Sequence, residues 1–477
     1  MQPYQQYIGG VFRDGRSDRS FHVLNPSTGE TLGSFAMASM EDIQDAIDAA
    51  RHAFRTWSRS SGLERANLLR RTGNLMRERR DQLSRHISLE LGKPTGEANR
   101  EVDLAAEMFD WASEESRRLY GRLIPARSQT VTQSALLEPI GPVGAFAGWN
   151  APAVTPSRKV SSALAAGCSI VIKPSEETAG VALCIAQAAH DAGVPAGVLN
   201  MVFGEAASVA DQLCESPDIA MITFTGATAI GAQLGSKAAL TMKRATLELG
   251  GHAPVIVCAD VDVERLAGAA VAAKYRNAGQ VCTSPTRFLV DKKVFESFSD
   301  CFVTAARALR VGDPFAAGTQ MGPLKNERRL AAVELMVQDA RARGLDIAAG
   351  GRRIGGPGSF YEPTVIMHPD RDCEAARVEP FGPIALLSPF NTLDEALMEA
   401  NRLPFALAAY AFTNRISDSH RLINEIESGA VAINEWQVSQ PETPFGGYKY
   451  SGLGSEGGVE GLREFLKTKS VRMGTFA

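Results

Sequence analysis

The spacing of hydrophobic residues divides the chain into helical and strand-like segments. Between about residues 40 and 116, apolar positions recur every three to four residues, which predicts long amphipathic helices. From Gly141 onward, short apolar runs alternate with helical stretches of about ten residues or more. The strand-like runs are VGAFAG, SIVIKP, VLNMVFG and IAMITFTG, and the helices are expected near 156–166, 177–192 and 205–213. This alternation is typical of a mostly parallel sheet covered by helices.

A second α/β pattern begins near ELGGHAPVIV and includes the strand-like runs FLVDKKV, TVIM and AYAFT. Helices are expected near 294–309 and 325–343. Two segments differ from this pattern. In TVTQSALLEP, apolar and polar residues alternate as in an edge strand. Near the C-terminus, a short helix is expected in GVEGLREFLK, followed by a terminal strand in TKSVRM. Since one core seldom serves more than about 300 residues, we expect this chain of 477 residues to form two large domains.

Composition narrows the classes of function. The net charge of -4 gives no broad basic surface for nucleic acid or anionic lipid, so a small-molecule substrate is favoured. No apolar run reaches the ~18–20 residues of a membrane span, and the opening MQPYQQYIGG has no signal-peptide pattern. The seven cysteines lack a C-x-x-C pair and the histidines lack H-E-x-x-H, which argues against disulfides and a catalytic metal. We therefore expect a cytoplasmic protein.

Cysteine is the first candidate for chemistry. Cys282 follows a helix-like stretch within YRNAGQVCTSPTRF, where small and polar neighbours are compatible with an exposed, reactive thiolate. Cys168, Cys184 and Cys258 lie in apolar runs and are interpreted as structural. Because a single cysteine is more often structural than catalytic, Cys282 needs supporting residues.

Two more segments supply candidate partners. Glu248 precedes a Gly-Gly pair in ELGGHAP. If its carboxylate is buried, it would act as a general base, whereas a solvated glutamate at a strand end would have no catalytic role. Asn150 follows a strand in GAFAGWNAPAV, where its amide would donate to an oxyanion or merely shape a turn.

Further segments favour a dinucleotide. Lys173, Ser175 and Glu176 follow the strand SIVI, and ligands of parallel sheets bind at the carboxyl ends of strands. FTGATAIG runs from a strand through a glycine turn into a helix, a geometry that offers backbone N–H groups to a pyrophosphate. The segment lacks the G-x-G-x-x-G pattern, so the signal is weak by itself.

Together these segments resemble the aldehyde dehydrogenase superfamily, and the resemblance covers nearly the whole chain. The matching segments, in order, are FHVLNPSTGE, WNAP, ALAAGCSIVIKPSEET, FTGATAIG, LELGGHAPVIV, NAGQVCTSPTRF, EPFGP and PFGGYKYSGLGSEGG. Among such enzymes the motifs are closest to those of NAD(P)-dependent succinate-semialdehyde dehydrogenases. The resemblance implies an α/β fold with a Rossmann-like dinucleotide-binding domain (1–118 and 140–248), a catalytic domain (249–445) and a small β oligomerisation arm (119–139 and 460–477).

The resemblance also implies roles for individual residues. Cys282 corresponds to the nucleophile, Glu248 to the general base, and Asn150 to the oxyanion donor together with the Cys282 N–H. Lys159 and Glu456 match residues of a proton relay. The product would be a carboxylic acid, released when water hydrolyses a thioester on Cys282.

The expected cofactor is NAD, with NADP still possible. Glu379 would hold the nicotinamide ribose, with Phe381 near the ring, and Lys173 and Glu176 would hold the adenosine ribose. Glu176 would repel a 2′-phosphate, although Lys173 would compensate if Glu176 turned away. The remaining expected cofactor contacts are Trp149, Ser175, Phe224, Thr225, Gly226, Thr228, Gly231, Leu249 and Gly250.

The substrate is interpreted as an aldehyde with an acid at its far end. Arg158 and Arg276 match carboxylate-binding arginines of succinate-semialdehyde dehydrogenases, and Ser439 is a third candidate contact. Succinate, glutarate and 2-oxoglutarate semialdehydes all remain open, as do uncharged aliphatic or aromatic aldehydes. A CoA-acylating enzyme is a rival interpretation that Glu248 disfavours, and a catalytically silent binding protein with the same fold is a rival from a different class.

Two positions depart from the family pattern. The usual proline before Trp149 is Gly148, which would loosen the turn that carries Asn150. In the FTG turn, Ala227 stands where the family often has a residue with a hydroxyl group. One hydrogen bond to a pyrophosphate would therefore be lost. The resemblance further implies assembly into a homodimer or homotetramer.

Overall fold

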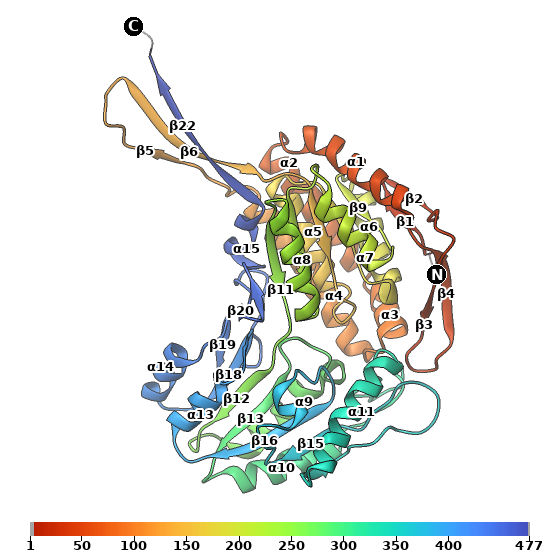
Figure 1. The fold of residues 1–477 in the computed structure, drawn as a ribbon, viewed down its shortest axis with the longest axis vertical. Coiled ribbons are helices and arrows are strands. Elements are labelled where there is room, and N and C mark those ends of the chain that lie inside the picture. The colour runs from red at the N-terminus through yellow and green to blue at the C-terminus, as the bar shows by residue number, and fades with distance from the viewer. Residues whose placement is uncertain (1–3, 476–477) are drawn as a thin grey trace.

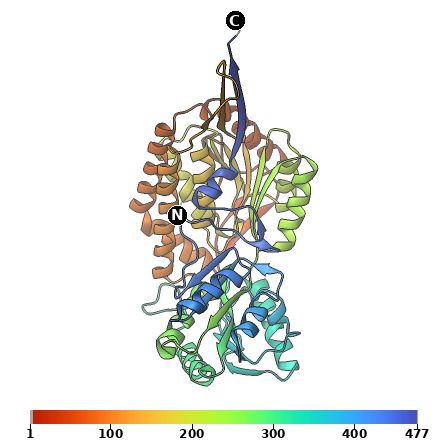
Figure 2. The same ribbon diagram turned by 90° about the vertical axis from the view of Figure 1, so that its left-hand side faces the viewer.

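Two α/β lobes are stacked along the long axis of the molecule, and a thin β arm extends from one end (Figures 1 and 2). The computed structural model describes residues 4–475. The α/β class expected from the alternating pattern is confirmed, because each lobe is built on a mainly parallel sheet with helices on both faces.

The first lobe contains an eight-stranded sheet of order β2-β1-β9-β8-β7-β10-β11-β21. The five strands from β9 to β11 are parallel, whereas the strands at both edges are antiparallel. The bounds are β1 (Gln6–Ile8), β2 (Val11–Arg13), β7 (Val143–Phe146), β8 (Ile170–Lys173), β9 (Leu199–Met201), β10 (Met221–Thr225), β11 (Arg244–Glu248) and β21 (Gly452–Leu453).

Helices pack on both faces of this sheet. One apolar core joins the sheet to α1, α7 and α8, and the second joins it to the layer of α2 to α6. The periodic apolar positions expected near the N-terminus, such as Ile43 and Ile47, are fully buried in the first of these cores. The bounds are α1 (Met40–Trp57), α2 (Gly62–Glu78), α3 (Arg80–Leu91), α4 (Thr95–Glu115), α5 (Val154–Ala166), α6 (Ala179–Ala192), α7 (Ala206–Glu215) and α8 (Thr228–Leu240), with the short η1 (Glu176–Thr178) before α6.

Local sequence signals set the ends of several helices. Ser39 and Asp42 form a capping box at the start of α1, each side chain accepting the other's backbone N–H. Helices α5 and α6 end at Gly167 and Gly193, whose φ angles of 88° and 91° favour glycine. The two glycines therefore form the helix-to-strand turns that lead into β8 and β9, at the amino ends of these strands.

The second lobe contains a seven-stranded sheet of order β14-β15-β16-β13-β12-β18-β19, in which only β14 is antiparallel. The strands are β12 (Ala253–Val257), β13 (Pro285–Asp291), β14 (Asp346–Ala349), β15 (Thr364–Met367), β16 (Ile384–Phe390), β18 (Ala408–Phe412) and β19 (Ala430–Ile433). The helices are α9 (Val263–Tyr275), η2 (Arg276–Gly279), α10 (Phe295–Arg307), α11 (Glu327–Ala342), α12 (Glu374–Arg377), α13 (Leu393–Ala400) and α14 (Ile416–Glu425).

Three small sheets complete the fold. The arm has the order β22-β6-β5 and projects away from the first lobe, with the C-terminal strand lying along it (Figure 1). Helix α15 (Gly458–Glu464) precedes β22 and packs against α5. The strands are β5 (Arg122–Ile124), β6 (Val131–Pro139) and β22 (Leu466–Gly474) in the arm, β3 (Ser20–Leu24) with β4 (Thr31–Ala36), and β17 (Phe405–Ala406) with β20 (Tyr448–Lys449).

Candidate active site

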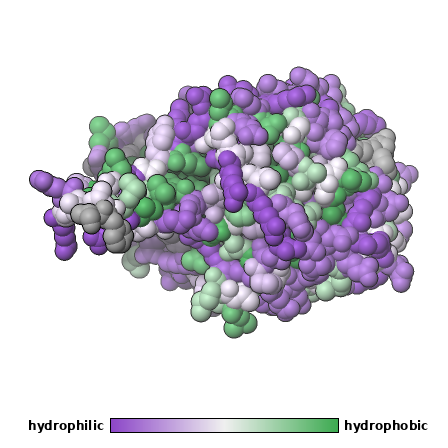
Figure 3. Space-filling model, turned by 90° about the horizontal axis from the view of Figure 1, so that it is seen from above, coloured by the Kyte–Doolittle hydropathy of each residue, from purple (hydrophilic) through white to green (hydrophobic). Residues whose placement is uncertain are grey.

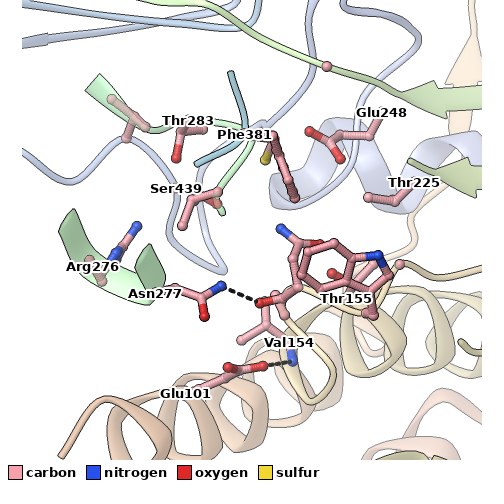
Figure 4. Close-up of a pocket in the computed structure, with 18 of the residues that line it drawn as sticks. Glu101, Val154, Thr155, Thr225, Glu248, Arg276, Asn277, Thr283, Phe381 and Ser439 are labelled. Carbon is pink, nitrogen blue, oxygen red and sulfur yellow. Dashed lines mark hydrogen bonds between the residues drawn. The ribbon is translucent and has the colours of Figure 1, made fainter. Parts of the chain in front are cut away.

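A cavity of about 1110 Å³ lies where the carboxyl ends of β7, β10 and β11 face the second lobe (Figure 4). Asn150 follows β7, Glu248 ends β11, and Cys282 lies in the loop between η2 and β13. All three residues line the cavity, together with Glu379. The structure therefore brings together four candidate residues that are far apart in the sequence.

The Cys282 thiol is not the exposed thiolate that the sequence favoured. Its residue is partly buried, and burial together with the charges of Glu248 and Glu379 raises the pKa of the thiol well above its usual value. The charge of Arg158 opposes this shift but is a smaller effect. At neutral pH the free thiol is therefore protonated, and a base has to remove its proton before it can act as a nucleophile.

Glu248 is placed to be that base. Its side chain is buried rather than solvated, and burial, followed by the charge of Glu456, raises the pKa of Glu248 to about 7. The Cys282 thiol and the cations Arg158 and Lys159 lower it in part. Within the described residues, its Oε1 atom has no hydrogen-bond partner. A carboxyl group with this pKa exchanges protons readily near neutrality.

Asn150 is tied to the loop that carries Cys282. Its Nδ2 donates to the carbonyl oxygen of Gln280 at 3.3 Å, and its own carbonyl oxygen accepts from Asn277 Nδ2 at 3.1 Å. Gly148 leaves little room here, since a Cβ atom would lie 3.3 Å from Asn150 Oδ1. The side-chain amide of Asn150 therefore faces the cavity in a defined position, despite the loss of the usual proline.

Lys159 and Glu456 form a buried ion pair behind Glu248. Lys159 Nζ also donates to Thr223 Oγ1 at 2.8 Å, and only 1% of the lysine side chain is exposed. Thr225 Oγ1 lies 3.5 Å from Glu456 Oε1. The two residues of the expected relay are thus in contact, and the charge of Glu456 acts directly on the pKa of Glu248.

Glu379 packs against the Gly-Gly turn that follows Glu248. Its Oε1 accepts from the Gly251 N–H at 3.2 Å, and a Cβ atom on Gly250 would lie 2.6 Å from its second carboxylate oxygen. Burial raises the pKa of Glu379 to about 8. An acceptor held in this way at the cavity wall suits the hydroxyl groups of a ribose.

An aromatic pair covers this side of the cavity. The rings of Trp149 and Phe381 meet edge to face with centroids 5.5 Å apart. The N-terminus of α8 opens nearby, and its N-cap residue Ala227 provides no side-chain cap. Free N–H groups at such a terminus bind phosphate. The residues present therefore fit a nicotinamide dinucleotide.

The remaining cofactor candidates fall into two groups. Thr225, Gly226, Leu249 and Gly250 line the cavity. The other candidates do not line the cavity, and each of them contacts other residues of the protein. Lys173 and Glu176 form an ion pair of 2.5 Å, Ser175 caps η1, Thr228 Oγ1 donates to the Tyr450 carbonyl, Phe224 is buried against Phe146, and Gly231 packs against Leu249.

The three substrate candidates all line the cavity. Arg158 is buried, donates to Ser439 Oγ at 2.7 Å and lies over the Phe445 ring at 4.9 Å. Its Nη1 also lies 3.8 Å from Glu456 Oε2, so Arg158 belongs to the buried charge cluster of the site. Arg276 is exposed to the cavity and, within residues 4–475, its side chain makes no hydrogen bond or ion pair.

Several residues of the cavity wall had no sequence signal. Tyr410 and Trp436 line it with ring centroids 5.4 Å apart, and the Tyr410 hydroxyl donates to the Thr283 carbonyl at 2.7 Å. They come from β18 and from the loop after β19, which carry no recognisable motif. Only the fold brings these aromatic rings beside Cys282.

Comparison with known proteins identifies the family of the chain. The family model described as the aldehyde dehydrogenase family matches residues 12–471, so the chain belongs to that family. It is an NAD(P)-dependent aldehyde dehydrogenase, which confirms the class of enzyme and of cofactor expected from the motifs.

Individual relatives are similar over almost their whole length. The chain is 42% identical to 4-(hydroxymethyl)benzenesulfonate dehydrogenase TsaD1 of Comamonas testosteroni, covering 97% of this chain and 96% of the relative. It is 42% identical to the mitochondrial succinate-semialdehyde dehydrogenase of Arabidopsis thaliana, covering 98% and 89%. The crystal structure of succinate-semialdehyde dehydrogenase from Burkholderia pseudomallei superposes with a TM-score of 0.96 at 39% identity, covering 99% and 98%.

Two kinds of feature are absent from the part of the chain that the structure describes. None of the helices within residues 4–475 is long and apolar enough to cross a membrane. Over the same range, no group of three or more histidine, cysteine or acidic side chains is arranged to hold a metal ion.

Proposed function

We propose that this aldehyde dehydrogenase oxidises an aldehyde whose far end carries an anion, with succinate semialdehyde as the leading candidate. The observation that carries the proposal is the presence of Arg158, Ser439 and Arg276 in the cavity that contains Cys282. A planar guanidinium can bind a carboxylate through two charge-assisted hydrogen bonds. The side chain of Arg276 has its donors available for such a group.

The similar proteins support an anionic substrate of either of two shapes. Several are named succinate-semialdehyde dehydrogenases, and two carry the name 4-(hydroxymethyl)benzenesulfonate dehydrogenase. The substrates in both names place an anion at the end opposite the reacting carbon. A benzaldehyde that bears an acid group is the second candidate, because the rings of Tyr410 and Trp436 would pack against an aromatic ring.

The proposed first step is nucleophilic addition. Glu248 accepts the proton of the Cys282 thiol, and the sulfur then bonds to the aldehyde carbon, so that the carbonyl oxygen becomes an oxyanion. Asn150 Nδ2 and the Cys282 N–H stabilise that oxygen, and each such donor is worth about 2.7–4 kcal/mol. In the part of the chain that the structure describes, the Cys282 N–H has no other acceptor.

The second half of the reaction releases the acid. A bound nicotinamide dinucleotide supplies the acceptor for the hydride that leaves the tetrahedral carbon. Loss of that hydride leaves a thioester on Cys282. Glu248 first loses the thiol proton to solvent, and then takes a proton from a water molecule, whose oxygen adds to the thioester carbon. When this intermediate collapses, the Cys282 sulfur leaves and the carboxylic acid is formed.

Within this scheme, Glu379 would hold the nicotinamide ribose and Lys173 and Glu176 the adenosine ribose. We propose NAD as the preferred cofactor, because the Glu176 carboxylate would repel a 2′-phosphate while accepting hydrogen bonds from a ribose diol. The ion pair between Lys173 and Glu176 supports this preference, since it reduces the positive charge that Lys173 offers to a phosphate.

Assembly is a further part of the proposal. The arm exposes large apolar side chains on its strands, and hydrophobic and hydrophilic side chains are mixed around it when the molecule is seen from that end (Figure 3). These arm residues are Leu123, Ile124, Leu136 and Met473. Unpaired strand edges with apolar side chains favour pairing with another chain, so we propose a homodimer or homotetramer. The free cysteines support a reducing, cytoplasmic location.

The test compares kcat/KM for semialdehydes, aliphatic aldehydes and aromatic aldehydes, each with NAD and with NADP. Semialdehydes should exceed uncharged aldehydes of the same length, and Arg276→Ala should raise KM for semialdehydes about tenfold or more, the value of one charged hydrogen bond. Arg265→Ala is the matched control, because Arg265 is an exposed residue of α9, the helix that leads to Arg276, and lies outside the cavity. Equal losses on charged and uncharged aldehydes would contradict the proposal.

A further inference from the structure

Two glutamates on helix α4 each hold one of the loops that form the site. Glu97 Oε2 accepts the backbone N–H of Asn277 at 3.0 Å. One turn further along the same face, Glu101 Oε1 accepts the N–H of Ala153 at 2.9 Å and that of Val154 at 3.5 Å (Figure 4). Helix α4 therefore fixes both the loop that leads to Cys282 and the turn after Asn150.

Asn277 is in an unusual conformation. Its φ angle is 50° and that of Ala278 is 53°, so two successive residues with side chains adopt the left-handed region. Such residues cost about 1–3 kcal/mol each and persist only where their surroundings hold them. The Asn277 side chain is buried and its N–H is bound by Glu97. The hydrogen bond to Glu97 is thus one of the contacts that hold this strained turn.

The strained turn connects directly to the proposed oxyanion donor. Asn277 Nδ2 donates to the carbonyl oxygen of Asn150 and to that of Gln280, both at 3.1 Å. Asn150 Nδ2 donates to the same Gln280 oxygen at 3.3 Å. If the Asn277 turn relaxed, the backbone of Asn150 would lose its contact with the loop of Cys282.

Burial and the neighbouring cations have opposite effects on the ionisation of the Glu97 carboxyl group. Burial raises the pKa of Glu97, whereas the neighbouring cations Lys93, Arg276 and Arg100 lower it. A hydrogen bond from an N–H to a carboxylate is about twice as strong as one between neutral groups. Lys93 also forms an ion pair with Glu101, so this one cation acts on both glutamates.

We infer that Glu97 is a positioning residue of the oxyanion site, which acts by holding Asn277 and, through it, Asn150 in register with Cys282. The inference rests on the roles proposed for Cys282 and Asn150. It predicts that Glu97 affects the step in which charge develops on the aldehyde oxygen. It does not predict an effect on reactions of the thiol that form no oxyanion.

The experiment separates these two kinds of reaction. Stopped-flow absorbance measures the first NADH formed per active site, and iodoacetamide alkylation measures the reactivity of the Cys282 thiol. Glu97→Ala should slow the first NADH about 10- to 100-fold, the range for a misplaced oxyanion donor. It should leave unchanged the alkylation rate and the aldehyde concentration that half-saturates the first NADH phase. Glu97→Gln should recover most of the rate, because its amide oxygen accepts the same N–H.

The control is Glu114→Ala, which removes an exposed carboxylate from the same helix and should change neither rate. A second variant, Asn277→Gly, tolerates the left-handed backbone but lacks the side-chain donors. It should slow the first NADH as Glu97→Ala does, and the double variant should be little slower than either single one. If Glu97→Ala does not fold, a slow Asn277→Gly together with an active Glu97→Gln supports the inference.

Several results would overturn it. These are an unchanged first turnover in Glu97→Ala, a parallel loss of alkylation, a Glu97→Gln variant as slow as Glu97→Ala, or independent, additive effects of Glu97 and Asn277. Each comparison uses whichever aldehyde the unaltered enzyme oxidises fastest. A failure of the substrate proposal therefore leaves this test intact, and the two failures are distinguishable.

Discussion

Hydrolysis of the thioester on Cys282 should accelerate as pH rises through neutrality, because Glu248 must be ionised to take a proton from water. Burial and the charge of Glu456 raise the pKa of Glu248 to about 7. With that pKa, about one tenth of the carboxyl groups are ionised at pH 6 and about nine tenths at pH 8, so the rate should rise about ninefold to tenfold. An unperturbed glutamate would be almost fully ionised at both pH values, and the rate would stay flat.

The assay follows NADH absorbance after rapid mixing with a saturating aldehyde. The first NADH per active site reports formation of the thioester, and the slower phase reports its hydrolysis. Glu248→Gln should still form up to one NADH per site, because loss of the Glu248 charge lowers the pKa of the Cys282 thiol and solvent then takes its proton, although more slowly than Glu248 does. Turnover should then stall, because glutamine cannot take a proton from the hydrolytic water. A slow phase that does not change between pH 6 and pH 8, or steady turnover in Glu248→Gln, would refute the role given to Glu248.

Three further changes have defined outcomes. Asn150→Ala should slow the first NADH about 10²- to 10³-fold with little effect on cofactor affinity, and an unchanged first phase would contradict its oxyanion role. Lys159→Met removes the nearer of two cations beside the buried Glu456, since Arg158 remains 3.8 Å away, so denaturant unfolding should show a loss of stability of up to about 3–5 kcal/mol, and a neutral result would mean that water reaches Glu456. The pKa of Glu379 is raised to about 8, so the stability that its protonated form provides is present at pH 4.5 and lost as pH rises through 8. Glu379→Gln should therefore raise Tm at pH 9 more than at pH 5, and an equal shift at both would contradict the buried carboxyl.

Much of the fold follows from local patterns in the sequence. Helix α5, expected near 156–166, spans Val154–Ala166, and α11, expected near 325–343, spans Glu327–Ala342. These helices have clear apolar periodicity and end near capping residues or glycine, so their existence and type are set locally. Their ends differ from the expectation by one or two residues, because the capping hydrogen bonds depend on the folded turn.

The site was less predictable than the fold. Motifs identified Cys282, Glu248 and Asn150, and the structure places all three at one cavity. The sequence did not indicate that the thiol would be protonated, because its pKa depends on burial and on the charges of Glu248 and Glu379, which approach only through the tertiary fold. Local chemistry alone makes Cys282 resemble a more exposed thiolate than it is.

Some residues of the site had no sequence signal, and Trp436 and Glu97 are two of them. Trp436 belongs to a loop without a motif, and Glu97 appears in the sequence as one acidic residue of a helix among many. Their importance comes from contacts made in the folded chain: Glu97 binds the N–H of Asn277, and the ring of Trp436 packs against that of Tyr410. A single sequence contains no record of such contacts, whereas the spacing of apolar residues records burial directly.

The most direct test of the mechanism is the mass of the intermediate trapped in Glu248→Gln. This variant, mixed with succinate semialdehyde and NAD and then digested with a protease, should contain one succinyl group per subunit on the peptide that carries Cys282. One NADH should form for each group found. NADH formed without an acyl group on that peptide, or an acyl group on any of the remaining six cysteines, would contradict covalent oxidation of a semialdehyde at Cys282.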